Sequence, residues 1–342
     1  MNTEPTRDGA AARPSATFLF CVESGYFEAQ TLLAVECLRT FGGRLADADV
    51  LIVTPRFGPS LEPATLRKFR ALGARHVTTS TRTNCSWYVY MNKGLAAALG
   101  EELAQTDQII WLDSDVLVVD EPQPLLLDPT EDFACCSIDK NVGTCGPDDP
   151  YNSYWLALSE HYQIPLQTLP WVVTDHDRQR VRFRLHSGVY AFRVGSGLGR
   201  AFVADMESML SSRICFSRKL PYPGDDVALA YSVVRLNLRW RQLPMACNLE
   251  MTPTSQSYSR TAARTAKILH YHKALATPGG SDWLLAELET FRPDVAEWLR
   301  SRVPLPTKLG GPHRSALRRL LFETRKLRQR HYENTSRFFV DA

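Results

Sequence analysis

The feature that most constrains this chain is a pair of aspartates between two short apolar runs. Residues 109–112 and 116–119 are rich in β-branched and large apolar side chains, and Asp113 and Asp115 stand between them, separated only by Ser114. Runs of this kind predict buried strands. Carboxylates at the end of a buried strand are costly unless a cation meets them, and their oxygens suit Mg²⁺ and Mn²⁺. The sequence therefore favours a metal or nucleotide site here over a solvated turn.

The residues before this pair alternate between strand and helix patterns. The predicted strands are 16–22, 50–54 and 76–79, and the predicted helices are 27–41, 63–72 and 86–99, each closed by glycine. Such alternation predicts right-handed βαβ units and a parallel sheet, and ligands bind at the carboxyl ends of the strands in such sheets. We therefore predict that residues 16–122 form a nucleotide-binding half.

The second half is predicted to shape the acceptor site. Its predicted strands are 133–138, 181–185, 188–193 and 267–272, and its predicted helices are 155–162, 201–210 and 227–234. We expect one domain over residues 16–300, with the acceptor half at 123–300. Residues 1–15 are polar and are expected to be a disordered tail.

Composition excludes several classes of protein. A hydrophobic share of 44% and a charged share of 23% are typical of a soluble globular protein. A net charge of +3 indicates no nucleic-acid partner, and no apolar stretch is long enough to span a bilayer, so a cytoplasmic location is expected. The eight cysteines lack a Cys-x-x-Cys pair, and buried thiols are predicted rather than disulfides or zinc.

Residues 109–118, Ile-Ile-Trp-Leu-Asp-Ser-Asp-Val-Leu-Val, resemble the Asp-x-Asp segment of GT-A-fold, nucleotide-sugar-dependent glycosyltransferases. Family eight, the retaining galactosyl- and glucosyltransferases, is the nearest match. Further segments resemble that family in its own order, at residues 22–26, 186–192, 224–229 and 268–271. The resemblance implies a GT-A (Rossmann-like) α/β fold with a mixed, mostly parallel sheet flanked by helices. It also implies metal-dependent transfer from a nucleotide sugar, in that family a UDP-sugar, to an acceptor hydroxyl with retention.

The resemblance assigns the metal ligands. Asp113, Asp115 and His270 match the residues that hold one Mn²⁺ or Mg²⁺ on the donor diphosphate in that family. His272 lies two residues further on, and strand alternation over 267–272 predicts that both histidines share a face. The choice between the two histidines stays open.

The resemblance also assigns donor-binding residues. Tyr26 matches the aromatic that stacks on the base, and Glu23 stands where the family usually has an aspartate, so the identity of the base is open. His186 replaces the family's asparagine beside the donor sugar. The remaining donor-binding predictions are Lys93, Ser114, Ser187 and Lys273.

Asp225 and Asp226 precede the predicted helix 227–234. Asp225 matches an aspartate that contacts the donor sugar, and Asp226 takes the place of the family's glutamine near the anomeric carbon. A carboxylate there would stabilise a cationic transition state or attack it. The alternative is that both acids only complement the helix dipole.

Residues 301–342 are predicted to be a linker and a basic helix. Residues 315–331 combine several arginines with Leu317, Leu320, Leu321 and Leu327 at helical spacing. Such a helix either lies on the anionic inner face of a membrane or packs on the core with its basic face in water.

Two other functions stay open at this point. A haloacid-dehalogenase-type phosphohydrolase also uses Asp-x-Asp after a strand, with residues 224–226 as a second acidic segment, although Leu117 stands where that family expects Thr or Val. A non-catalytic nucleotide-sugar-binding protein is the third class. The sequence does not identify the acceptor, which is a glycan, a lipid-linked glycan or a small molecule.

Overall fold

The computed structural model describes residues 16–218, 224–255, 258–306 and 309–340. The tail predicted at residues 1–15 lies outside the described residues.

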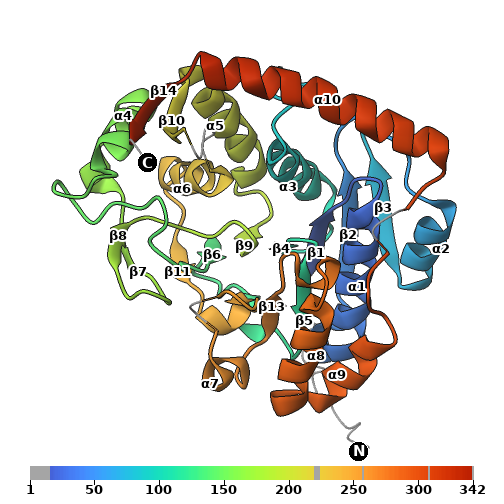
Figure 1. Cartoon of the computed structure of the whole chain (residues 1–342). Helices are drawn as coiled ribbons and strands as arrows, with labels where there is room; N and C mark the ends of the chain where they lie inside the picture. The colour runs from blue at the N-terminus through green and yellow to red at the C-terminus, as the bar shows by residue number, and fades with distance from the viewer. Residues whose placement is uncertain (1–15, 219–223, 256–257, 307–308, 341–342) are drawn as a thin grey trace, which may run out of the picture.

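Seven strands form the central sheet, in the order β11-β6-β9-β4-β1-β2-β3 (Figure 1). Their bounds are β1 (Ala16–Cys21), β2 (Asp49–Thr54), β3 (Ala74–Thr78), β4 (Gln108–Leu112), β6 (Phe133–Cys135), β9 (Val189–Arg193) and β11 (Trp240–Gln242). Strand β9 is antiparallel to β4 and β6, and the other pairs are parallel. The predicted mixed, mostly parallel α/β sheet is confirmed.

Helices cover both faces of this sheet. Alternate residues of β1 point to opposite faces: Phe18 and Phe20 pack with one layer, and Leu19 packs with the other. The first layer contains α1 (Tyr26–Phe41), α2 (Pro63–Ala71), α8 (Gly280–Phe291) and α9 (Pro293–Arg300). The second contains α3 (Met91–Leu103), α4 (Asn152–Tyr162), α5 (Leu198–Ser212) and α6 (Asp225–Arg235). Burial on both faces explains the continuous apolar runs.

A three-stranded sheet positions the late histidine beside the aspartates. Its order is β12 (Leu249–Glu250), β13 (Ile268–His270) and β5 (Val116–Val118). Strand β13 is antiparallel to β5, with His270 opposite Val116. Because Asp115 immediately precedes β5, this register brings residues more than 150 positions apart to one point.

The remaining elements lie around these sheets (Figure 1). They are β7 (Trp171–Val173), β8 (Arg180–Arg182), β10 (Ile214–Ser217), β14 (Arg337–Val340), α7 (Arg260–Ala263), α10 (Pro312–Asn334), η1 (Gly43–Leu45), η2 (Gln123–Leu125), η3 (Leu166–Thr168), η4 (Met245–Cys247) and η5 (Ala274–Ala276). None of the eight cysteines, all of which lie among the described residues, forms a disulfide. Six are buried as predicted, but Cys21 is half-buried and Cys145 is exposed.

The helix predicted at 86–99 is displaced in the structure. Helix α3 begins only at Met91 and continues past Gly100 to Leu103. A Cβ at Gly100 would lie 2.5 Å from Cδ2 of Leu19. This glycine therefore permits close packing of α3 on β1 rather than ending the helix, and Lys93 lies in the first turn of α3.

The strand predicted at 267–272 is also shorter than expected, since β13 ends at His270. Tyr271 is buried in the core, and His272 has a left-handed backbone with φ of 48°. The two histidine rings still stack, with centroids 4.1 Å apart. A turn, not strand alternation, brings them together.

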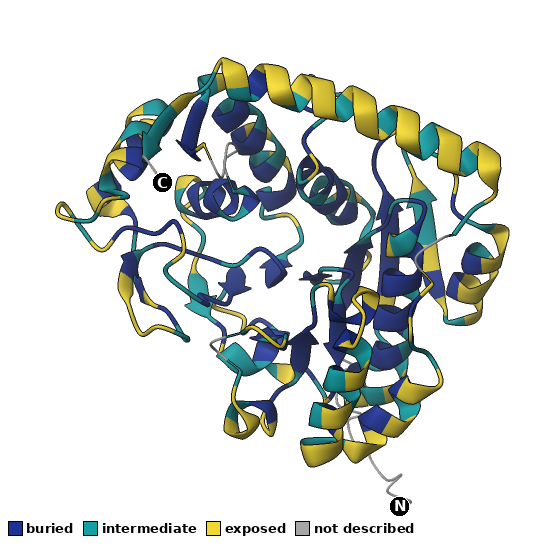
Figure 2. Cartoon of the chain, viewed as in Figure 1, coloured by how far each residue is buried: buried dark blue, intermediate teal, exposed yellow. Residues whose placement is uncertain are grey.

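Helix α10 runs along one edge of the molecule, from the region of α2 to that of β14 (Figure 1). Much of its surface is exposed (Figure 2). Its leucines do not share one face: Leu317 and Leu321 are half-buried, whereas Leu320 and Leu327 are each 64% exposed. Beyond it, β14 pairs with β10. Among the described residues, no helix combines the length and apolar character that a membrane crossing requires.

Candidate functional site

Two cavities meet at the carboxyl end of β4. The larger has a volume of about 480 Å³ and extends toward α6, and the smaller has a volume of about 340 Å³ and extends toward the β1–α1 loop. Both are lined by Tyr90, Lys93, Asp113 and Asp115. Asp113 and Asp115 therefore lie between the two cavities, so a ligand with one part in each cavity would contact both aspartates.

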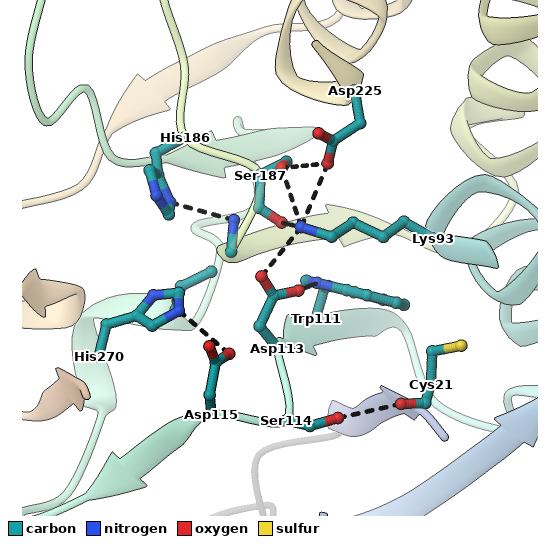
Figure 3. A network of polar contacts seen from close by, with 12 residues as sticks. Cys21, Lys93, Trp111, Asp113, Ser114, Asp115, His186, Ser187, Asp225 and His270 are labelled. Carbon is teal, nitrogen blue, oxygen red and sulfur yellow. Dashed lines mark hydrogen bonds and ion pairs between the residues drawn. The ribbon is translucent and has the colours of Figure 1, made fainter. Parts of the chain in front are cut away.

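Lys93 is the centre of the first polar cluster (Figure 3). Its Nζ lies 2.9 Å from Asp113 Oδ2, 3.2 Å from Asp225 Oδ2 and 3.1 Å from Ser187 Oγ. Burial opposes the charged ammonium, but the two carboxylates raise the pKa of Lys93 well above its usual value. The structure therefore brings Asp113, Ser187 and Asp225 together around the positively charged Lys93. The sequence had singled out all four residues.

Asp113 is held from several directions. Its Oδ1 accepts a 3.0 Å hydrogen bond from Trp111 Nε1, and its backbone N–H donates to the Gly188 carbonyl at 2.8 Å. Burial raises the pKa of Asp113 while Lys93 opposes that rise. The carboxylate is thus fixed and neutralised by the protein itself.

Asp115 faces two imidazoles instead. His270 Nε2 lies 3.1 Å from Asp115 Oδ1, and His272 Nδ1 lies 3.9 Å from Asp115 Oδ2. Burial opposes ionisation, but His270 and His272 hold the pKa of Asp115 at about 2. Ligand atoms of these three residues lie within 4.8 Å of one another, and they form the one such group found among the described residues.

This donor set fits a divalent cation. It offers two imidazole nitrogens and a carboxylate oxygen, and Glu250 Oε1 lies 3.6 Å from His272 Nε2. Mg²⁺ prefers oxygen ligands alone, whereas a mixed nitrogen and oxygen set suits transition metals such as Mn²⁺. Asp113, which the sequence predicted as a ligand, lies outside the group and is paired with Lys93.

Asn248 is a site residue that the sequence did not reveal. It is fully buried, and its side chain lies 3.0 Å from His270 Nδ1 and 2.8 Å from His186 Nδ1. The amide oxygen of Asn248 only accepts hydrogen bonds, so His270 donates through Nδ1, and its Nε2 is the nitrogen that faces Asp115 and could bind a metal. Its partners lie 22 and 62 residues away, so no local pattern marks it.

The same amide orients His186. Its Nδ1 accepts hydrogen bonds from the Asn248 amide and, at 3.1 Å, from the Gly188 N–H. The ring proton therefore resides on Nε2. Burial holds the pKa of His186 well below its usual value, and the side chain lines the larger cavity. His186 is thus a neutral hydrogen-bond donor toward that cavity.

Arg184 is a second residue that the sequence did not reveal. It is buried and forms an ion pair with Asp226. Burial raises the pKa of Asp226 and Arg184 opposes that rise. Asp226 Oδ1 also accepts a 3.0 Å hydrogen bond from the Val227 N–H at the start of α6. Asp226 and Arg184 both line the larger cavity, so the carboxylate faces it as half of an ion pair.

The two residues predicted to bind the base, Tyr26 and Glu23, lie in different surroundings. Tyr26 packs against the core with a buried hydroxyl and is not among the residues lining either cavity. Its neighbour Phe27 lines the smaller cavity instead. Glu23 also lines it, but its carboxylate forms two contacts with Arg56, of 2.7 and 3.0 Å.

The last two predicted residues line the smaller cavity as well. Ser114 is buried and donates a 3.0 Å hydrogen bond to the Cys21 carbonyl, which ties the Asp-Ser-Asp turn to β1 (Figure 3). Lys273 is exposed at the cavity wall. Ser114 therefore orients the turn, and Lys273 is accessible to a ligand.

Comparison with protein families gives one match. The family model described as the Rhodobacterales glycosyltransferase domain matches residues 18–237, which is more than half of the chain. The matched span contains Lys93, Asp113, Asp115 and Asp225, and ends before His270 and His272. The match confirms the predicted glycosyltransferase and not the phosphohydrolase alternative. No curated protein matches the chain.

Several solved structures are distantly similar. The galactosyltransferase LgtC in complex with donor and acceptor sugar analogs shares 14% identity, with a TM-score of 0.47, over 84% of this chain and 100% of that chain. Mouse xyloside xylosyltransferase 1 shares 12% identity, with a TM-score of 0.44, over 75% and 97%. GlyE of Streptococcus pneumoniae shares 12%, with a TM-score of 0.44, over 87% and 66%. The assignment rests on the family model and on the site.

Proposed function

This chain belongs to the Rhodobacterales glycosyltransferase family, and from that premise we propose that it transfers a sugar from a nucleotide sugar to an acceptor hydroxyl with retention. A UDP-sugar is the first candidate for the donor. The observation that carries the proposal is the Asp115–His270–His272 cluster beside the Lys93–Asp113–Asp225 cluster, where two cavities meet.

Asp115, His270 and His272 are the residues that would hold the metal, with Asp113 as the further ligand that the family resemblance implies. A bound Mn²⁺ or Mg²⁺ would offset the charge that develops on the leaving nucleoside diphosphate. Asn248 contributes by fixing the tautomer of His270, so that Nε2 faces Asp115.

Lys93 and Asp225 act on the donor sugar and diphosphate in this proposal. The Lys93 ammonium places a positive charge beside Asp113, where negative charge develops on the departing phosphate. Asp225 accepts hydrogen bonds from sugar hydroxyls, and Ser187, which donates to Asp225 at 2.5 Å, holds it in position. His186 donates to the sugar through Nε2.

Asp226 stabilises positive charge at the anomeric carbon. Its pairing with Arg184 makes it a poorer nucleophile, which favours electrostatic stabilisation over covalent attack. The bond from the anomeric carbon to the phosphate oxygen breaks, and a bond to the acceptor oxygen forms on the same face. The hydroxyl proton passes to the leaving phosphate, so the chain needs no separate base.

The outer face of α10 is the proposed membrane contact. Leu320 and Leu327 are exposed and, seven positions apart, share a face, and the exposed Arg319 and Arg328 flank that face on opposite sides. Basic residues near an anionic surface contribute about 1 kcal/mol each. Replacing both arginines with glutamate should abolish binding to anionic vesicles at low salt. Equal vesicle binding by the double variant and the native chain would leave α10 as part of the fold alone.

The function is tested with a panel of nucleotide sugars. We expect one of them to release its nucleoside diphosphate slowly in the presence of Mn²⁺, and EDTA to stop the release. Asp115→Asn is the matched control and should be inactive. Release of inorganic phosphate from phosphomonoesters, with no turnover of any nucleotide sugar, would contradict the proposal.

A further inference from the structure

The smaller cavity continues beneath α10. Glu23, Phe27 and Val89 line both that cavity and a neighbouring one with a volume of about 540 Å³. Phe27 and Val89 are 48% and 53% exposed, respectively, although both are large apolar side chains. The neighbouring cavity lies on the side of the smaller cavity away from the aspartates. Its far wall therefore bounds the nucleotide side of the site.

That far wall is one face of α10. The residues of α10 that line the cavity recur at intervals of three or four positions and so share a face; they are Phe322, Arg325, Lys326, Gln329, Arg330 and Glu333. Phe322 is 60% exposed, so its ring is accessible from the cavity.

The helix is held in this position at both ends. Near its start, Arg314 forms a 2.5 Å ion pair with Glu62. Near its end, the buried Tyr332 lies 5.1 Å from Trp87, measured between ring centroids, and β14 pairs with β10. A wall anchored in this way is preorganised for a ligand.

Helix α10 also covers the loop that the sequence predicts for base binding. Arg318 Nη1 donates to Ser24 Oγ at 3.2 Å, and a Cβ at Gly25 would lie 3.5 Å from the Arg318 side chain. In the same loop, Glu23 is occupied by Arg56. Groups outside the loop must therefore contribute to recognition of the base.

The charges of the cavity suit an anionic ligand. Glu23 is neutralised by Arg56, and Glu333 accepts a 2.9 Å hydrogen bond from Gln329. Arg325 lies 3.6 Å from Glu23, a longer contact than that of Arg56. The face of α10 carries three cations, Arg325, Lys326 and Arg330, against one carboxylate, and so complements a nucleotide.

We propose that the inward face of α10 forms the outer wall of the nucleoside end of the donor site. Phe27 and Phe322 supply apolar and aromatic surface for the base. Arg325 donates to oxygen or nitrogen acceptors on the base or ribose. The inference rests on the proposed function and extends it, because α10 lies outside the family-matched residues 18–237.

The test compares a nucleotide with its diphosphate portion alone. Calorimetry with Mn²⁺ would first rank UDP, CDP, GDP, ADP and dTDP, and the tightest would then be compared with inorganic pyrophosphate. Phe322→Ala and Arg325→Ala should weaken binding of that nucleotide about tenfold or more, on the scale of a lost base–aromatic contact, and leave pyrophosphate affinity unchanged. Leu327→Ala and Arg328→Ala, at exposed positions of α10 that do not line the cavity, are the matched controls and should change neither affinity.

Each result decides the matter. Unchanged nucleotide affinity in both inward-face variants overturns the inference and leaves the proposed function intact. Equal losses for nucleotide and pyrophosphate overturn it too, because the variants would then disturb the diphosphate site. If the native chain binds no nucleoside diphosphate with Mn²⁺, the proposed function fails and the inference fails with it. Since Phe322 is exposed, melting temperatures should match those of the controls.

Discussion

Asp113 and Asp115 are two residues apart, but their surroundings differ in kind. Asp113 is neutralised by a cation of the protein, since Lys93 lies 2.9 Å away and also contacts Asp225. Asp115 has no lysine or arginine ion-pair partner among the described residues, and faces His270 and His272. The charge of Asp113 is balanced by Lys93 without a ligand, whereas Asp115 and its two histidines are arranged for an added cation. The two surroundings should therefore respond differently to substitution.

Lys93→Met should have the largest effect. It leaves the carboxylates of Asp113 and Asp225 buried without their cation, and removing one partner of a buried ion pair costs about 3–5 kcal/mol. We expect loss of both stability and activity, measured by chemical denaturation and by donor turnover. A variant with native stability would show that the two carboxylates do not depend on Lys93.

Asp115→Asn should instead remove activity with little change in stability. The substitution keeps the volume of the side chain and removes only the charge that faces the histidines. We expect loss of Mn²⁺ binding by calorimetry and loss of turnover, beside a denaturation midpoint close to that of the native chain. Full Mn²⁺-dependent turnover would disprove the metal site.

Asp226→Asn tests a second carboxylate that is neutralised by the protein, the one paired with Arg184 that we place beside the anomeric carbon. Asparagine retains a hydrogen-bond acceptor for the Val227 N–H and for Arg184, but it no longer stabilises a developing positive charge. Losing a charged hydrogen-bond partner costs about 1.5–3 kcal/mol, so kcat and kcat/KM should fall together while donor affinity persists. An unchanged kcat per folded molecule would assign Asp226 to capping α6 alone.

Asn248→Ala tests the proposed metal site at Asp115 and His270 through a residue that contacts His270 but is not itself a ligand. Outer partners of metal-binding histidines are worth about 10–100-fold in metal affinity, and we expect a loss in that range by calorimetry. Histidine nitrogen chemical shifts should also show that His270 has lost its fixed tautomer. Native metal affinity together with native shifts would refute the positioning role.

The sequence was most informative where a function depends on strand ends. Asp113 and Asp115 follow a short apolar strand, so pattern alone placed them at the end of a strand, and the structure has them there. His270, which the family resemblance assigned, ends β13 in the three-stranded sheet and lies beside Asp115. Lys93 and Asp225 were placed by the order of family-like segments. Their roles remain predictions.

What the sequence did not reveal depends on packing between distant segments. Asn248 and Arg184 are buried polar residues whose importance comes from partners that only the fold brings close. Gly100 was misread as a helix end because close packing on Leu19 and chain termination require the same residue type. The position of α10 over the β1–α1 loop depends on Tyr332 and β14, for which no pattern was recognised.

His272→Ala should have the smallest effect, and it resolves the choice between the two histidines. His270 is buried, is oriented by Asn248 and lies 3.1 Å from Asp115, whereas His272 is more exposed and lies 3.9 Å away. A ligand held less firmly contributes less, because binding must first restrict its motion. We therefore expect His272→Ala to weaken Mn²⁺ binding by less than about tenfold, within one 1.4 kcal/mol step, and His270→Ala to weaken it more. The reverse order would show that the exposed histidine is the principal ligand. The metal cluster would then show a contrast like that between Asp113 and Asp115: His272 would bind the metal, and His270 would serve mainly to hold Asp115 in place.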